Sequence, residues 1–292
     1  MYKQIIEENK GLKKDDFLPG FAYCDGVRFD LQDEVNLMME PMANLLTEII
    51  EEKNINSILD VGSGSGALAF FLRQKNPSLS VVTIDGNCDI VESPYLKRGN
   101  HIVARTDKEY QIVDESGKKV EFDLIVCFEH IEHIQEENFD QFLENVINHS
   151  HKKTIFFATA AKWEYENEEE KHIHCNVKQL DGWGKYFDNF VSKSEDQDKK
   201  RMNIAAIDPM DMTSLIVNKK ISIDQMNELF SHPLTKYLMR FFDYFCLQPG
   251  SNFDINLRKY TTTKRREIEN WMHRGSSSVV FYSDGFIDMS EK

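Results

Sequence analysis

A glycine-rich segment that begins with an acid is the first part of this sequence whose residue types could do chemistry. It reads Asp60-Val61-Gly62-Ser63-Gly64-Ser65-Gly66. Glycine lacks a Cβ atom, so a chain rich in it can turn tightly and let a ligand approach its backbone closely. Asp85 ends the next apolar segment, where a carboxylate can accept both hydroxyl groups of a ribose. The pattern predicts a site for a ligand that contains a nucleoside.

The acid before the glycines narrows the class of that ligand. Dinucleotide-binding sequences have the spacing G-x-G-x-x-G, and their helix N-terminus meets a pyrophosphate. This chain has D-x-G-x-G-x-G, and a carboxylate at Asp60 would repel a pyrophosphate but suits the ammonium group of a methionine moiety. The spacing therefore disfavours a nicotinamide-dependent oxidoreductase.

A second group of titratable residues follows two later apolar segments. Residues 122–128 are followed directly by Glu129-His130-Ile131-Glu132-His133, and residues 154–158 are followed by His172, His174 and Asn176. Ligands of an open α/β sheet bind outside the carboxyl ends of its strands, so we expect these side chains to face the ligand. Histidine can take up a proton near pH 7, and imidazole with carboxylate can hold a divalent cation.

The elements that must position these groups alternate between strands and helices. Such alternation predicts a parallel sheet with helices on its faces. Helices are expected over 31–50, 67–72 and 138–149, with less regular helical stretches at 223–230 and 234–245, and a hairpin over 110–121. Strands are expected over 57–61, 80–84, 101–104, 122–128, 154–158, 202–207 and 278–282.

Residues 57–66 and 80–86 resemble motifs I and II of class I S-adenosylmethionine-dependent methyltransferases, and the resemblance covers roughly residues 45–190. It implies a doubly wound, Rossmann-like α/β sheet of seven strands, six of them parallel and one antiparallel. It also implies that S-adenosylmethionine is the cofactor, with Asp60 at its methionine end, Asp85 at the ribose and Asp107 at the adenine amino group. The cofactor-binding residues expected on this basis are Asp60, Gly62, Ser63, Gly64, Gly66, Asp85, Gly86, Asp107 and Phe128.

Three interpretations of the segment from Glu129 to His133 stay open. In the first, E-x-x-E-H resembles the string found in many small-molecule methyltransferases that use no metal. His133 is then the catalytic base, His174 is the alternative base, and Glu129 orients the substrate or a histidine. In the third, the histidines are surface polar residues beside an acidic run.

The second interpretation is a metal site. Glu129, Glu132 and His133 would join His172 or His174 around Mg, Mn or Fe(II), which this donor set suits. The arrangement resembles that of metal-dependent 2'-O-methyltransferases that act on the 3' end of small RNAs. The formal net charge of −14 weighs against a nucleic-acid partner without excluding it. We therefore favour a site without metal.

The organisation expected from the sequence has three parts: a helical lead-in at 1–50, a methyltransferase domain at 51–208, and a mainly helical extension at 209–292 that covers the substrate or dimerises. A homodimer is compatible with this division. Five scattered cysteines without a C-x-x-C pair indicate reduced thiols. No apolar run reaches the ~20 residues of a membrane-spanning helix, so we expect a cytoplasmic protein.

Together these features predict a methyltransferase that uses S-adenosylmethionine to methylate an oxygen of a sugar or another polar small molecule. Two alternatives remain: a metal-dependent RNA 2'-O-methyltransferase, and a catalytically silent scaffold that keeps the cofactor pocket.

Overall fold

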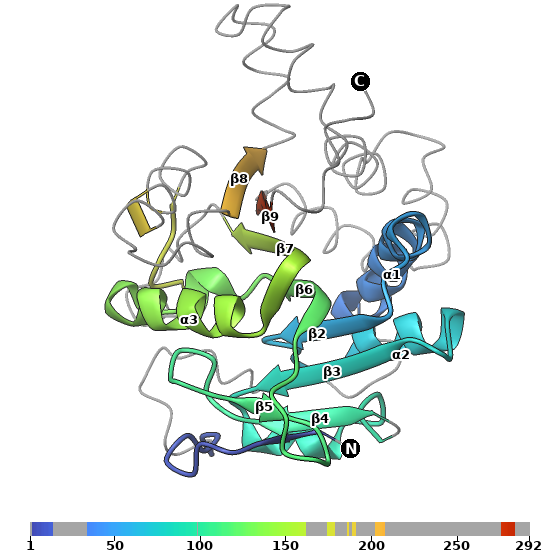
Figure 1. Ribbon diagram of the computed structural model, residues 1–292, viewed down its shortest axis with the longest axis horizontal. Coiled ribbons are helices and arrows are strands. Elements are labelled where there is room, and N and C mark those ends of the chain that lie inside the picture. Colours follow the sequence, from blue (N-terminus) through green and yellow to red (C-terminus); the bar gives the residue numbers. More distant parts are fainter. Residues whose placement is uncertain are drawn as a thin grey trace, which may run out of the picture.

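The computed structural model describes residues 2–13, 34–97, 99–161, 174–178, 186, 189–190, 202–207 and 276–283. Their main feature is a sheet of seven strands in the order β4-β3-β2-β6-β7-β9-β8 (Figure 1). Its strands are β2 (Ser57–Val61), β3 (Ser80–Asp85), β4 (Asn100–Val103), β6 (Phe122–Phe128), β7 (Ser150–Ala161), β8 (Met202–Ile207) and β9 (Ser276–Ser283).

Strand direction follows the expected pattern of six parallel strands and one antiparallel strand. Each pair from β4 to β7 is parallel, whereas β9 runs antiparallel to both β7 and β8. The chain builds β3 and β4 on one side of β2 and then crosses to build β6 and β7 on the other side. Such a reversal of strand order is where open α/β sheets bind ligands.

Helices cover both faces of the sheet. The helices α1 (Glu34–Lys53) and α2 (Ala67–Lys75) lie on one face, and α3 (Glu136–Asn148) lies on the other (Figure 1). The core under α1 and α2 includes Leu46, Ile58 and Leu72, and the core under α3 includes Phe139 and Phe142. Burying apolar side chains between helices and sheet supplies the main favourable term in folding.

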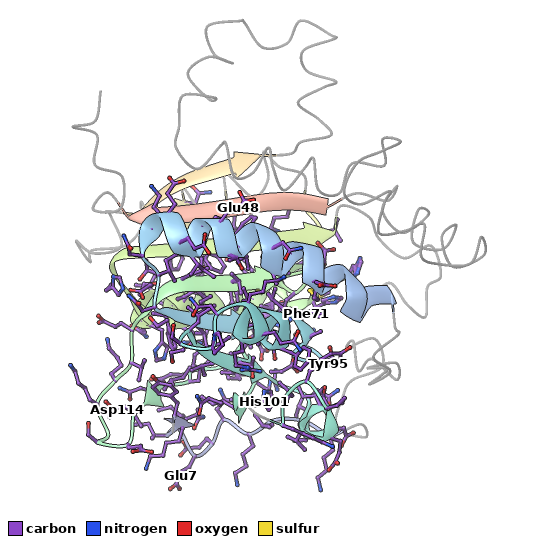
Figure 2. The ribbon with its side chains drawn as sticks, turned by 90° about the vertical axis from the view of Figure 1, so that its right-hand side faces the viewer. Glu7, Glu48, Phe71, Tyr95, His101 and Asp114 are labelled. Atoms are coloured by element: carbon purple, nitrogen blue, oxygen red, sulfur yellow. The ribbon has the colours of Figure 1, made fainter. Side chains whose placement is uncertain are left out.

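An aromatic group joins α2 to the segment after β3. Figure 2 shows Phe71, a residue of α2, near Tyr95, and their ring centroids are 6.4 Å apart. The ring of Tyr95 also meets that of Phe70 edge-on at 5.1 Å. A short 3-10 helix, η2 (Cys88–Glu92), lies just before this group. The packing fixes the loop after β3 against the helix that follows the glycine segment.

The N-terminal residues form an element that the sequence does not predict. Strand β1 (Lys3–Gln4) pairs antiparallel with β5 (Ile112–Val113) in a second, two-stranded sheet. The expected hairpin at 110–121 is present, with a bridge between Val113 and Lys119 and a turn at Gly117. This small sheet holds the N-terminal segment beside the loops that follow β3 and β4.

The expected strands at 202–207 and 278–282 are confirmed as β8 and β9. Strand β9 comes from the part expected as a C-terminal extension, yet it lies inside the main sheet between β7 and β8. The division of the chain at residue 208 stays a prediction, as do the helical stretches at 223–230 and 234–245, which lie outside the described residues. Among the described helices, none is long and apolar enough to cross a membrane.

Candidate active site

The glycine loop between β2 and α2 takes a backbone conformation that L side chains rarely adopt. Gly62, Gly64 and Gly66 have φ values of 70°, 50° and 78°. A Cβ atom at Gly62 would overlap the ring of His130, and one at Gly66 would overlap the side chain of Leu96. At Gly64 it would meet no described atom within 4 Å. Packing thus explains two of the glycines, and the third faces open space in which a ligand could lie.

Asp85 ties this loop to the end of β3. Its Oδ2 accepts a hydrogen bond of 2.9 Å from the backbone N–H of Gly64, and its Oδ1 accepts one of 2.8 Å from the N–H of Asn87. The backbone N–H of Gly62 also donates to the carbonyl of Ile84 at 2.9 Å. The acid expected to bind the ribose therefore already shapes the loop expected to hold the methionine end.

Asp60, the last residue but one of β2, is a buried acid, and one of its carboxylate oxygens has no hydrogen-bond donor among the described residues. Its side chain is 3% exposed, and its Oδ2 accepts no hydrogen bond from the residues that the structure describes. Burial, together with the negative charge of Asp85, raises the pKa of Asp60 to about 7, although Arg73 opposes this shift. A buried carboxylate of this kind is stabilised by a cation. The ammonium group of S-adenosylmethionine fits that requirement.

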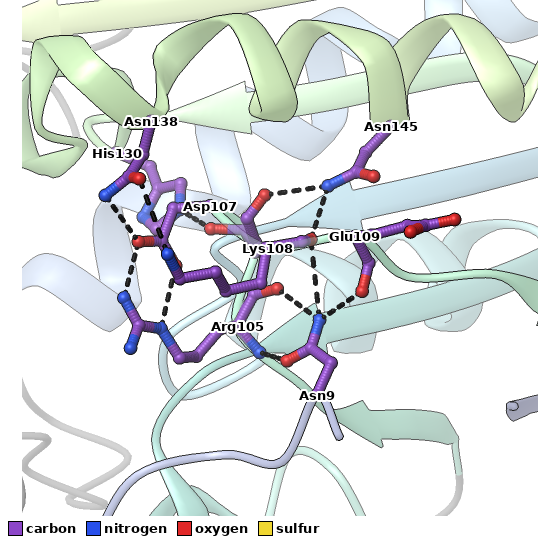
Figure 3. Close-up of polar contacts among 9 residues, drawn as sticks. Asn9, Arg105, Asp107, Lys108, Glu109, His130, Asn138 and Asn145 are labelled. Carbon is purple, nitrogen blue, oxygen red and sulfur yellow. Dashed lines mark hydrogen bonds and ion pairs between the residues drawn. The ribbon is translucent and has the colours of Figure 1, made fainter. Parts of the chain in front are cut away.

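Asp107 is held in place by a charged partner that the sequence analysis did not single out. Its oxygens accept hydrogen bonds from Nε and Nη2 of Arg105 at 2.9 and 2.6 Å, and from Nδ2 of Asn138 at 3.3 Å (Figure 3). Asp107 is 7% exposed, whereas the side chain of Arg105, its bidentate partner, is 27% exposed. Contact of Asp107 with an adenine amino group stays a prediction, and Arg105 fixes the direction in which the acid points.

His130 is a structural residue of the site that sequence reasoning missed. Its ring lies against Gly62, and its Nε2 is 2.8 Å from Oγ1 of Thr106. Burial lowers the pKa of His130 well below its usual range, so the ring is neutral at physiological pH. His130 therefore links the glycine loop to the loop that carries Asp107. Its place beside Glu129 in the E-H-I-E-H segment was the only signal in the sequence.

The expected catalytic residues gather after β6. Glu129 has a φ of 48°, in the left-handed region, and the 3-10 helix η3 (Ile131–His133) follows it. The rings of His133 and His174 meet edge-on, with centroids 5.0 Å apart. The backbone N–H of Asn176 donates to the carbonyl of Glu132 at 3.0 Å, which anchors the segment from His174 beside η3. His133 and His174 are thus brought together although they are distant in sequence.

Glu132, His133 and His174 also form a group that could hold a metal ion, since one ligand atom from each lies within 4.8 Å of the others. Glu132 is fully buried, and His174 is 7% exposed. Glu129 does not belong to this group, because it precedes η3 with a left-handed backbone instead of sharing its turn. His172 lies outside the described residues.

The remaining expected residues lie around the same edge of the sheet. Ser63 keeps its hydroxyl buried within the glycine loop, and Gly86 follows Asp85 directly. Phe128 ends β6, and its ring meets that of Phe157 edge-on at 5.2 Å. Burial raises the pKa of Asp85, while the backbone N–H groups of Asn87 and Gly64 oppose this rise and His133 opposes it more weakly. The two halves of the site therefore lie within electrostatic reach of each other.

Comparison with known proteins assigns the chain to a family. Residues 33–190, more than half of the chain, match the family model described as a methyltransferase domain. The chain belongs to this family, and its resemblance to class I S-adenosylmethionine-dependent methyltransferases is confirmed.

Individual relatives are distant. A sphingolipid C9-methyltransferase of Komagataella phaffii (strain GS115 / ATCC 20864) is 26% identical over 172 residues, which cover 52% of this chain and 35% of that protein. The plantazolicin methyltransferase BpumL in complex with S-adenosylhomocysteine has a TM-score of 0.51 at 12% identity, covering 85% of this chain and 84% of the other. The plantazolicin methyltransferase BamL has a TM-score of 0.52 at 10% identity, covering 88% of each chain. These structures share the fold.

The open space at Gly64 leads to a prediction that separates binding from folding. Gly64→Ala places a Cβ atom at a positive φ, which costs roughly 1–2 kcal/mol, and fills the space in front of the loop. Gly117→Ala is a matched control, because Gly117 has a φ of 82° and its Cβ would also meet no described atom within 4 Å. We expect similar losses of Tm in both variants but a loss of S-adenosylhomocysteine affinity of at least about tenfold, or 1.4 kcal/mol, in Gly64→Ala alone. Unchanged affinity in Gly64→Ala would place the cofactor elsewhere.

The raised pKa of Asp60 predicts a pH dependence of cofactor binding. An ammonium ligand prefers ionised Asp60, so the affinity for S-adenosylhomocysteine should fall by about tenfold per pH unit as the pH drops below 7 and level off above it. Calorimetry between about pH 5.5 and 8.5 would measure this slope. Asp60→Asn should bind weakly at every pH and lose the slope. A slope that persists in Asp60→Asn would instead assign the proton to another group, such as Asp85.

Proposed function

We propose that this protein transfers the methyl group of S-adenosylmethionine to a hydroxyl oxygen of a sugar or another polar small molecule. One observation carries the proposal: His133 lies in η3, which follows the carboxyl end of β6, and its ring meets that of His174 with centroids 5.0 Å apart. A base at this point of the sheet lies beside the site proposed for the reactive methyl group. Methylation of a neutral hydroxyl needs such a base, because the oxygen loses its proton as the new bond forms.

Each residue then has a distinct task. S-adenosylmethionine, when bound, supplies a methyl group that its sulfonium centre has already activated. The backbone around Gly64 and the carboxylates of Asp60 and Asp85 hold the two ends of the cofactor. His133 accepts the proton of the acceptor hydroxyl, and Glu129 orients the acceptor or the histidine. The main contribution of the protein is to align the reacting groups and exclude water.

The choice of a polar small molecule rests on charge. The formal net charge of −14 disfavours a polyanion such as nucleic acid. The relatives are named for a sphingolipid and for plantazolicin, so proteins of this fold serve different acceptors.

Cys127 and Cys175 are free thiols, which supports a reducing compartment such as the cytoplasm.

The direct test is to incubate the purified protein with S-adenosylmethionine and separate panels of sugars, other hydroxylated metabolites, lipids, peptides and RNA. Release of S-adenosylhomocysteine together with a methylated sugar or hydroxylated metabolite would support the proposal. Methylation of a lipid, peptide or RNA would correct the acceptor. Cofactor binding without turnover on any panel would favour the scaffold alternative.

His133→Ala is predicted to lower turnover by at least about 100-fold while leaving S-adenosylhomocysteine affinity within a factor of about two, because general-base catalysis typically contributes that much. His151→Ala is the matched control, since His151 lies at the start of β7, away from the site, and bonds Asp123 at 3.0 Å. Steady-state kinetics and calorimetry on both variants would check this. Full turnover in His133→Ala would remove His133 as the base.

A metal-dependent methyltransferase is the second candidate, and the close approach of Glu132, His133 and His174 favours it. One carboxylate oxygen and two imidazole nitrogens suit Mn or Fe(II), with open positions for an acceptor oxygen.

The metal-free proposal predicts that turnover survives treatment with EDTA unchanged. The second candidate is distinguished by the opposite result: loss of turnover in EDTA, recovery on addition of Mn²⁺, and no recovery in Glu132→Gln. Metal analysis of the protein as purified would show whether an ion is already bound. Either result leaves the assignment of the cofactor site standing, because neither the glycine loop nor Asp85 belongs to the metal group.

A further inference from the structure

Residues 9–12 of the N-terminal segment pass directly over two loops of the cofactor site. Leu12 forms a parallel bridge with Asn87. The N–H of Leu12 donates to the carbonyl of Gly86 at 2.6 Å, and the N–H of Cys88 donates to the carbonyl of Leu12 at 3.0 Å. The turn after Asp85 is thus paired, backbone to backbone, with a segment from the start of the chain. We call residues 9–12 the strap.

The strap fits closely against this turn. A Cβ atom at Gly11 would overlap Cγ1 of Val103 and would lie 2.8 Å from the carbonyl oxygen of Gly86 and 2.9 Å from Sγ of Cys88. Real Cβ atoms essentially never approach backbone oxygen so closely, so a side chain at Gly11 would displace the strap. The close packing of the strap therefore requires glycine at position 11.

Asn9 connects the strap to the second loop, the one that carries Asp107. Its side chain is buried, with Oδ1 accepting from the N–H of Arg105 at 2.9 Å. Its Nδ2 donates to the carbonyls of Arg105 at 2.9 Å, Glu109 at 2.8 Å and Lys108 at 3.4 Å (Figure 3). The side-chain amide of Asn9 therefore joins the two ends of segment 105–109 through their backbone groups. Buried polar groups satisfied in this way rigidify what they join.

The loop that Asn9 closes also contacts the glycine loop. Thr106 meets His130, whose ring lies against Gly62, while Arg105 holds both oxygens of Asp107. From the opposite side, Nδ2 of Asn145 donates to the carbonyls of Thr106 and Lys108. Two asparagines, one from the strap and one from α3, thus clamp the short segment expected at the adenine.

The strap has its own anchor away from the site. Strand β1 pairs with β5, and the N–H of Ile5 donates to the carbonyl of Gln111 at 3.1 Å. Nε2 of Gln4 donates to the carbonyls of Ile6 and Asn9, which shapes the turn that leads to the strap. The strap is therefore anchored on one side by β1 and on the other by Leu12, so it can hold the loops that it contacts in place.

We propose that the strap is part of the S-adenosylmethionine site and that Asn9 is a positioning residue for its adenine end. By fixing segment 105–109, Asn9 sets the position of the Asp107 carboxylate, and so the preference of the site for a base that carries an amino group. The inference rests on the proposed placement of the adenine at Asp107. In this proposal Asn9 acts through segment 105–109 and not through contact with the cofactor.

The test compares S-adenosylhomocysteine with S-inosylhomocysteine, in which an oxygen replaces the adenine amino group. Calorimetry on the wild-type protein should show a preference of at least about tenfold for the adenine ligand. In Asn9→Ala we expect the affinity for S-adenosylhomocysteine to fall by at least about tenfold and the preference to shrink toward one. A general loss of stability would weaken both ligands alike and leave their ratio unchanged.

Two further variants complete the experiment. Asn76→Ala removes two turn hydrogen bonds from Ser78 in the turn before β3, at the amino end of that strand, so it should lower Tm without changing either affinity. Gly11→Ala displaces the strap without touching Asn9, so it should reproduce the loss of preference, and it serves if Asn9→Ala does not fold.

The proposal is overturned by equal binding of both ligands to the wild type, or by an unchanged ratio in the strap variants. A wild-type protein that binds neither ligand would contradict the cofactor assignment itself.

Discussion

The burial of two carboxylates, Asp60 and Asp85, where the neighbouring parallel strands β2 and β3 end is the constraint around which much of the site is arranged. Burial raises the pKa of each acid, and the negative charge of Asp85 raises that of Asp60 further. Backbone N–H groups of the glycine loop and of the turn after β3 offset this for Asp85. Asp60 keeps an oxygen for which the described residues provide no donor. A cationic ligand would relieve this cost, so the features that destabilise the free protein are those that favour cofactor binding.

Around these acids, each loop is held by a neighbour from another part of the chain. His130 fills the space that Gly62 leaves and reaches Thr106, while Leu96 fills the space beside Gly66. The glycines are therefore needed as much for packing as for ligand access. Of the three loop glycines, only Gly64 would place a Cβ atom in space that no described atom occupies within 4 Å, although its φ of 50° also favours glycine. That difference distinguishes the part of the loop that faces a ligand from the part that supports it.

The main sheet and the cofactor loop could be predicted from the sequence because both are local in origin. A strand, a turn and a helix are specified by neighbouring residues, and the spacing around Asp60 and Asp85 is typical of one class of fold. The strap could not be predicted, since Asn9 acts on Arg105 and Glu109 through contacts that leave no periodic pattern. The approach of His133 to His174 was expected only in the metal-site interpretation, which also included Glu129 and left His172 and His174 as alternatives. The residue types indicated candidate bases and metal ligands, but the fold was needed to show that His133 and His174 are in contact.

The position of β9 in the sheet has a consequence for how the protein reaches its native state. This strand lies between β7 and β8, although it follows both of them in the chain. During synthesis, β7 and β8 emerge before the strand that must be inserted between them, so each presents an unpaired edge until β9 arrives. Such edges are templates for association with other chains, and pairings between distant segments form slowly. The native sheet therefore cannot be completed until the chain has been made as far as β9.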